Sequence, residues 1–114
     1  MYIGYSNRKI QKICEDFKKA AKYSNPSVAL SLTTRLNEFS AADHLGEISH
    51  LPPQRKHMLK GSYKHHYAVD LTCRYRLIFY PCDIEGDLIE TNSDFNPAKI
   101  ECIVITEVSN HYDD

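Results

Sequence analysis

Residues 56–80 combine basic, histidine and tyrosine side chains with the alternation that is typical of β-strands, and Asp70 is the only acidic residue among them. A cationic sheet suits a polyanion, and imidazoles move protons near neutral pH. An RNA phosphodiester is a substrate that needs both properties. The basic residues and histidines of this stretch are Lys56, His57, Lys60, Lys64, His65, His66, Arg74 and Arg76.

RNA supplies its own nucleophile, the 2′-OH, so its cleavage needs neither a metal ion nor an organic cofactor, and we expect none here. The reaction needs a base, an acid and a cation that stabilises the charged pentacoordinate phosphorus. Arg76 is the first candidate for the cation, since a guanidinium offers a planar fork to two phosphate oxygens. The alternative for Arg76 is a surface ion pair with Asp70 or with the acidic segment 83–94.

His57 is the candidate acid or base, because an imidazole titrates at about 6.5, and the alternative is a solvated histidine at a strand end. His65 and His66 are adjacent, so on a strand they would point to opposite faces and could not easily share one metal ion. We predict that His65 touches RNA, together with Arg74 on the same strand face as Arg76. The lysines predicted to bind phosphates, or alternatively to form a solvated rim, are Lys56, Lys60 and Lys64.

The net charge of −1 conceals an uneven distribution of charge along the chain. Residues 1–82 contain 13 Lys and Arg against 6 Asp and Glu, whereas residues 83–114 contain 1 against 9. A basic surface beside an acidic segment is typical of nucleic-acid binding, and two solvated faces are the alternative. The field that acts on a polyanion is local, so the overall balance does not exclude RNA.

The length of 114 residues predicts a single domain over residues 1–114, and 42% hydrophobic with 25% charged residues is ordinary for a soluble globular protein. No apolar run approaches the roughly 18 residues of a membrane helix, and the N-terminus lacks the apolar stretch of a secretory signal. We therefore expect a cytoplasmic protein. The four cysteines form no C-x-x-C pair and are predicted to be reduced, buried thiols: Cys14, Cys73, Cys82 and Cys102.

Two helices joined by a short link are predicted after an edge strand at residues 2–5. Asn25 is a good cap for the second helix, and Pro26 suits its first position. Residues 40–43 resemble a capping box that opens one more turn, through Ile48. The apolar stripe of the first helix is Ile10, Ile13, Cys14, Phe17 and Ala21, and that of the second is Val28, Ala29, Leu32, Leu36 and Phe39.

After the prolines at 52–53 the apolar period changes to two, which predicts strands at 63–71, 74–80 and 100–108 around a turn-rich acidic segment at 83–99. No crossover helices separate these strands, so they should pair antiparallel. The expected fold class is α+β, with the N-terminal strand and the helical hairpin packed on a small, twisted, mainly antiparallel β-sheet.

Four stretches of the sequence resemble the RelE/ParE toxin superfamily, and within it the HigB-like, or plasmid maintenance killer, branch. The most specific feature is the spacing from H-x-L-x-G at residues 57–61 to Tyr-Arg-Leu at residues 75–77. Together the stretches span nearly the whole chain. They are IGYSNRKIQKICEDFKKAAK, the region from RLNEF to LPP, HMLKG followed by YAVDLTCRYRLIFYP, and the terminal IECIVITEVSNHY.

The resemblance implies a RelE-like fold and the toxin of a type II toxin–antitoxin system. Most HigB-like toxins cut mRNA on the translating ribosome and are neutralised by a helix-turn-helix antitoxin. The resemblance implies catalytic roles for Arg76 and His57. The family ends in Asp-Tyr-His, and the corresponding residues here are Asn110, His111 and Tyr112. His111 and Tyr112 are therefore candidates to replace the family's catalytic pair, and a disordered tail is the alternative.

Two further functions remain open because the ending differs from that of the family. ParE-like members of the superfamily inhibit DNA gyrase through protein contacts. A degenerate toxin would only bind its antitoxin and so regulate an operon. The partners expected for the leading hypothesis are a cognate helix-turn-helix antitoxin and mRNA on the ribosome, with no membrane and no metal.

Overall fold

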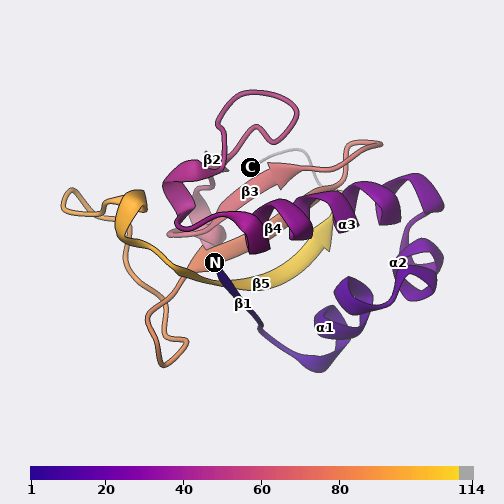
Figure 1. Cartoon of the computed structure of the whole chain (residues 1–114), viewed down its shortest axis with the longest axis horizontal. Coiled ribbons are helices and arrows are strands. Elements are labelled where there is room, and N and C mark those ends of the chain that lie inside the picture. The colour runs from indigo at the N-terminus through magenta and orange to yellow at the C-terminus, as the bar shows by residue number, and fades with distance from the viewer. Residues whose placement is uncertain (111–114) are drawn as a thin grey trace.

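The N-terminal segment and the late strands form one sheet in the computed structural model, which describes residues 1–110 (Figure 1). Within this part of the chain, five strands lie in the order β1-β5-β4-β3-β2. β1 pairs in parallel with β5, and the other neighbours are antiparallel, so the predicted α+β class is confirmed. The strands are β1 (Tyr2–Tyr5), β2 (His57–Met58), β3 (Tyr67–Asp70), β4 (Arg76–Pro81) and β5 (Cys102–Ser109).

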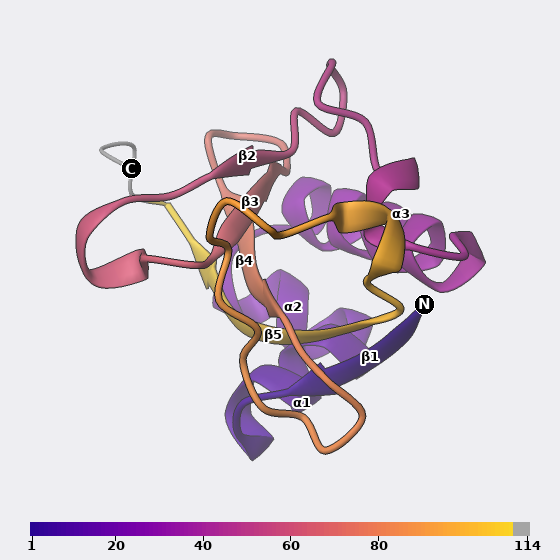
Figure 2. The ribbon, with the colours of Figure 1, turned by 90° about the vertical axis from the view of Figure 1, so that its left-hand side faces the viewer.

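The α-helices found in residues 1–110 lie on one face of the sheet, behind the strands in Figure 2. Asn25 caps the third helix by accepting a hydrogen bond from the Val28 N–H (2.9 Å), and Pro26 takes the first position, as predicted. None of these helices has the length and apolar character that a membrane span requires. They are α1 (Arg8–Glu15), α2 (Phe17–Tyr23) and α3 (Pro26–Ala41).

The predicted first helix is divided into α1 and α2 at Asp16, whose backbone is extended. The Asp16 carboxylate accepts hydrogen bonds from the backbone N–H groups of Lys18 (2.9 Å) and Lys19 (3.2 Å). Asp16 therefore ends one helix and caps the next. The break changes the helical register, and Phe17, which the apolar spacing places in the core, is 49% exposed.

Two predicted elements in the middle of the chain differ in their bounds. The further turn predicted before Ile48 is present as a short 3₁₀ turn, η1 (Leu45–Glu47), but its N-cap is His44 and not residues 40–43, the first two of which belong to α3. The strand predicted at 63–71 is limited to β3. The residues before it form a second turn, η2 (Gly61–Tyr63), and His65 has a left-handed φ of 68° that a strand cannot contain.

Arg74 lies in the turn before β4 and not in a strand. Its φ of 64° and the φ of 57° at Cys73 are both left-handed, so the strand predicted at 74–80 begins only at Arg76. The same turn exposes Cys73, and the prediction of a buried thiol is wrong there. Cys82 is buried as expected, and all four thiols are free.

The acidic segment 83–99 forms turns, as predicted, and ends in a third 3₁₀ turn, η3 (Pro97–Lys99). Gly86 has a φ of 88°, a conformation that glycine adopts without strain. The last strand then begins at Cys102, two residues later than predicted, because the turn continues up to Ile100.

The helix-covered face of the sheet contains the main core. Phe39 of α3 meets Phe79 of β4 edge to face, with ring centroids 5.1 Å apart. The opposite face, called the open face below, has a small buried cluster in the described chain, formed by Leu59, Ala68 and Ile78 with Tyr63 packed against them. Leu59 and Tyr63, from the segment before β3, therefore cover part of the open face.

Two titratable groups at α1 and β1 link stability to pH. Burial, and then the charge of Glu15, raises the pKa of the Cys14 thiol from its usual 9.0 to about 12. Burial, and then Cys14 and Glu15, raises the pKa of Tyr5 from 10.0 to about 12. Both raised values favour the neutral form in the folded protein. The stability that they contribute is complete below about pH 9 and is lost as the pH rises toward 12.

We therefore expect the free energy of unfolding to be roughly 2–3 kcal/mol lower at pH 10 than at pH 8, because the unfolded chain ionises Cys14 more readily than the folded one, and likewise Cys82, whose pKa burial raises from 9.0 to about 11. Urea denaturation at the two pH values measures the difference. Cys14→Ala should remove roughly half of the decrease, whereas Cys73→Ala, at an exposed thiol, should leave it unchanged. An equal decrease in both variants would contradict this assignment.

Candidate functional site

The open face presents two rows of side chains that cross neighbouring strands. The strand register aligns one row over β2, β3, β4 and β5, consisting of His57, Ala68, Ile78 and Glu107. The second row, over β3, β4 and β5, consists of Asp70, Arg76 and Ser109. Opposed residues of an antiparallel pair share a face, so Arg76 lies one row away from the row that ends in Glu107.

Arg76 also lines a concavity of about 480 Å³, together with Arg55 and Arg74. Arg55 forms a two-point ion pair with Asp70, with Nε–Oδ2 at 2.8 Å and Nη2–Oδ1 at 3.0 Å. The lining contains three guanidinium groups and one carboxylate, so it favours an anion. We call this hollow the arginine concavity; its lining is Arg55, Asp70, Leu71, Arg74, Tyr75 and Arg76.

Arg76 is only 6% exposed, although it borders this concavity. A guanidinium that is poorly hydrated loses less water when it meets a phosphate, and its field is less screened than at an open surface. The predicted cation therefore lies where its field is less screened than at an open surface.

A carboxylate–phenol pair lies beside Arg76 on the open face. The hydroxyl of Tyr63, at the end of η2, donates a short hydrogen bond to Glu107 Oε1 on β5. This bond, followed by burial, raises the pKa of Tyr63 above its usual 10.0, while the nearby charge of Arg76 opposes the rise. Tyr63 thus keeps its proton at neutral pH, and Glu107 is held in place by it.

The two adjacent histidines occupy different environments. The ring of His66 lies between two tyrosine rings, with centroids 5.9 Å from Tyr63 and 5.3 Å from Tyr80. His65 Nδ1 accepts the backbone N–H of Thr91 at 2.9 Å, which ties the loop before β3 to the acidic segment. The RNA contact of His65 stays a prediction. In residues 1–110, no three His, Cys, Asp or Glu side chains are grouped as a metal site would need.

The three lysines predicted to bind phosphates are also separated. Lys56 Nζ donates to the Leu45 carbonyl (3.0 Å) and lies 5.9 Å from the ring centre of Tyr67, which belongs to the main core. Burial lowers the pKa of Lys56. This position puts Lys56 toward the helical side of the sheet, while Lys60 and Lys64 are exposed beside η2. Their contacts with RNA stay predictions.

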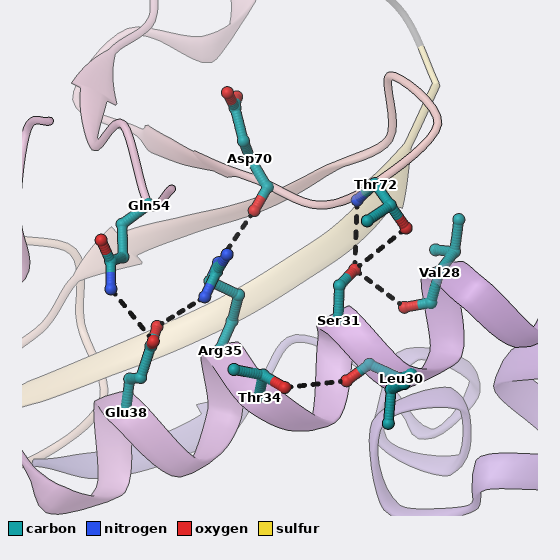
Figure 3. Close-up of polar contacts among 9 residues, drawn as sticks. All are labelled: Val28, Leu30, Ser31, Thr34, Arg35, Glu38, Gln54, Asp70 and Thr72. Atoms are coloured by element: carbon teal, nitrogen blue, oxygen red, sulfur yellow. Dashed lines mark hydrogen bonds and ion pairs between the residues drawn. The ribbon is translucent and has the colours of Figure 1, made fainter. Parts of the chain in front are cut away.

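Helix α3 fixes the end of β3 through a buried arginine (Figure 3). Arg35, 7% exposed, donates from Nε to the Asp70 carbonyl (3.0 Å) and from Nη1 to Glu38 Oε1 (2.9 Å). Gln54 Nε2 donates to the other oxygen of Glu38 at 3.0 Å. The backbone of Asp70 is thereby fixed by α3 from the helical side of the sheet, while the Asp70 carboxylate holds Arg55 at the arginine concavity.

The turn that follows β3 is held by the same helix (Figure 3). The Thr72 N–H donates to Ser31 Oγ at 3.1 Å, and Ser31 Oγ donates to the Val28 carbonyl at 3.2 Å. Thr72 directly follows Asp70 and Leu71, which line the arginine concavity. The helical layer therefore sets the position of the turn that presents Arg74.

Replacing Arg35 by methionine should lower the free energy of unfolding by about 2 kcal/mol, because the change removes two hydrogen bonds to a buried charged group and leaves the Asp70 carbonyl unpaired. Urea denaturation measures the loss. Arg8→Met, at an exposed arginine, should change stability by less than about 0.5 kcal/mol. Equal effects of the two substitutions would show that the Arg35 contacts add no stability.

Three residues of this site were not among the predicted ones. Arg55 follows a proline pair and has a φ of 47°, and nothing in the local pattern points to the concavity. Tyr63 fell within the strand predicted at 63–71, whereas it belongs to η2 and packs on the open face. Glu107 had a usable signal, because it is a carboxylate within an apolar strand. Of the predicted residues, the structure brings Arg74 and Arg76 together and places His57 on the same face, whereas His111 and Tyr112 lie outside the described residues.

The chain was compared with protein-family models, with curated proteins and with solved structures. No family model matches it. The searches of curated proteins and of solved structures also find no match.

Proposed function

We propose that this protein is the toxin of a type II toxin–antitoxin pair and an endoribonuclease that cuts mRNA on the ribosome. The observation that carries the proposal is the buried Arg76 at the arginine concavity, next to the hydrogen-bonded Tyr63 and Glu107. A guanidinium for a phosphate and a carboxylate for a proton are two of the groups that RNA cleavage needs. The resemblance of four sequence stretches to HigB-like toxins supports the same substrate.

In the proposed reaction the 2′-oxygen of RNA attacks the adjacent phosphorus and the bond from phosphorus to O5′ breaks. The products are a 2′,3′-cyclic phosphate and a 5′-OH. Arg76 binds the two non-bridging oxygens, whose negative charge grows in the transition state. Arg55 and Arg74, in the same concavity, hold the neighbouring phosphate and so fix the substrate.

Glu107 accepts the proton of the 2′-OH, with Tyr63 orienting its carboxylate, and His57 donates a proton to O5′. The attacking and leaving oxygens of an in-line displacement lie on opposite sides of phosphorus. His57 and Glu107 stand at opposite ends of one row, three strand spacings or roughly 14 Å apart between Cα atoms. Ala68 and Ile78 between them are buried in the cluster with Leu59 and Tyr63, so the phosphodiester would bind at Arg76 in the neighbouring row, with one proton-moving group toward each end.

The proposal also implies partners and a compartment. The substrate is mRNA on the ribosome, and the inhibitor is a helix-turn-helix antitoxin, which we expect to compete for the same positive charge. Because the ribosome and the antitoxin are cytoplasmic, we propose the cytoplasm as the location of this protein.

Tightly induced expression without an antitoxin, with growth followed and mRNA 5′ ends mapped, tests the proposal. Growth arrest with new 5′ ends inside translated messages is the expected result. Arrest with intact messages and damaged DNA would replace the nuclease by a gyrase inhibitor. Unimpaired growth with folded protein present would leave a degenerate toxin that only binds its antitoxin.

A further inference from the structure

A second hollow lies on the helical layer, between α1 and α2. It encloses about 290 Å³, and its floor is apolar, formed by Ile13 and the ring of Tyr23. Four lysines surround that floor: Lys9, Lys12, Lys19 and Lys22. This hollow differs from a solvated basic surface, because a ligand can pack a flat, apolar group against the floor while the lysines bind its negative charges.

An adjoining hollow of about 230 Å³ continues from this one toward the sheet. The two share Lys9, Ile13 and Tyr23, and the second extends along β5 to Glu107. β1 pairs with β5 only as far as Ile105, so the edge of β5 beyond that point borders the hollow. We call the two hollows together the lysine groove.

Tyr23 stands where the two hollows meet. Its hydroxyl donates to the Val108 carbonyl of β5 (3.1 Å), which fixes the ring, and the side chain is still 46% exposed. Lys9 Nζ lies 5.7 Å from the centre of the ring. A fixed, accessible aromatic ring with cations around it matches the way in which single-stranded nucleic acids are bound, by phosphate contacts and by stacking.

We propose that the lysine groove binds the single-stranded message beyond the cleaved bond, with its lysines on successive phosphates and Tyr23 against a sugar or a base. The identity of the strand rests on the proposed function, because the groove leads to Glu107. An acidic protein segment would also match the lysines. The groove reaches Glu107 at the edge of β5 that β1 leaves unpaired, and this favours RNA, since a strand that leaves the open face could pass around this edge into the groove.

Fluorescence anisotropy with a labelled 2′-O-methyl RNA of about 12 nucleotides, which has no free 2′-OH to attack, tests the groove without requiring cleavage. The groove variant combines Lys12→Gln, Lys19→Gln and Lys22→Gln. The control variant combines Arg8→Gln, Lys18→Gln and Lys99→Gln, which remove the same charge from exposed positions outside the groove.

We expect the groove variant to raise the Kd at least about 10-fold and to reduce the slope of log K against log salt by about 2, the effect of three lost phosphate contacts. The control variant should change the Kd by less than about 3-fold, through long-range charge alone. Equal weakening in both variants, or none in the groove variant, would overturn the proposal. The proposal would also be overturned if the groove variant bound the oligonucleotide normally but bound empty ribosomes or an acidic partner protein more weakly.

The same experiment separates this inference from the proposed function. Glu107→Gln should slow cleavage of translated messages by a factor of about 10²–10⁴ and should not weaken binding of the oligonucleotide, because it removes a negative charge from the groove. Specific groove binding in a protein that never cleaves RNA would refute the nuclease and retain the groove. Full cleavage with normal oligonucleotide affinity in the groove variant would refute the groove and retain the nuclease.

Discussion

Replacing Arg76 by glutamine is expected to slow the cleavage of ribosome-bound mRNA by a factor of about 10²–10³, the usual loss when one preorganised donor to a developing anion is removed. The reason is the position of Arg76. It is 6% exposed, stands beside Glu107 in the next row of the open face and lines the arginine concavity. No other arginine combines burial with both contacts in the described part of the chain, so Arg55 and Arg74 should not compensate.

The rate is measured in single turnover with a message positioned on purified ribosomes, and thermal unfolding verifies that each variant folds. Arg76→Lys retains the charge but loses the planar fork, so it should recover only part of the rate. Arg8→Gln, at an exposed arginine on α1, is the matched control and should cleave normally. A folded Arg76→Gln protein that cleaves at the wild-type rate would remove Arg76 from the site.

Replacing Glu107 by glutamine is expected to slow cleavage by a factor of about 10²–10⁴, the range for loss of a general base. The amide oxygen of glutamine can still accept the hydrogen bond from Tyr63, so the open face should keep its shape. What is lost is the ability to accept the proton of the 2′-OH. The effect should appear in the rate constant of the chemical step and not in substrate affinity.

The pH dependence of the rate distinguishes a base from a merely structural carboxylate. Wild-type cleavage should rise with pH on the acid side, and Glu107→Gln should lose this dependence together with the rate. Tyr63→Phe keeps the ring on the cluster of Ala68 and Ile78 and removes only the hydroxyl, so it should retain the rising limb at a reduced rate. An unchanged pH profile in Glu107→Gln would show that another group accepts the proton.

The sequence predicted the fold class well because periodicity and capping act locally. The cap at Asn25, the proline at the start of α3 and the edge strand at residues 2–5 all follow from neighbouring residues. The errors occurred where one residue interrupts a pattern. The carboxylate of Asp16 accepts backbone N–H groups and so divides the first helix. The left-handed His65 and Arg74 precede β3 and β4 and delay the start of strands that alternation alone would begin earlier.

The candidate site was only partly predictable because it depends on which strands become neighbours. Glu107 meets Tyr63 only after β5 pairs with β4 and η2 folds over the open face, a contact between residues 44 positions apart. Lys56 has the residue type of a phosphate ligand, but its ammonium bonds to the Leu45 carbonyl on the helical side. Residue type therefore indicated the chemistry, and strand pairing selected which residues share the open face with Arg76.

The most direct test of the central claim is the chemistry of the cut itself. A message with a single 2′-deoxy substitution at the cleaved nucleotide is compared with the unmodified message on purified ribosomes. Metal-independent attack by the 2′-OH predicts that the unmodified message gives a 2′,3′-cyclic phosphate and a 5′-OH, and that the deoxy message stays intact. Cleavage of the deoxy message, a product with a free 3′-OH, or no cleavage of either message would contradict the claim.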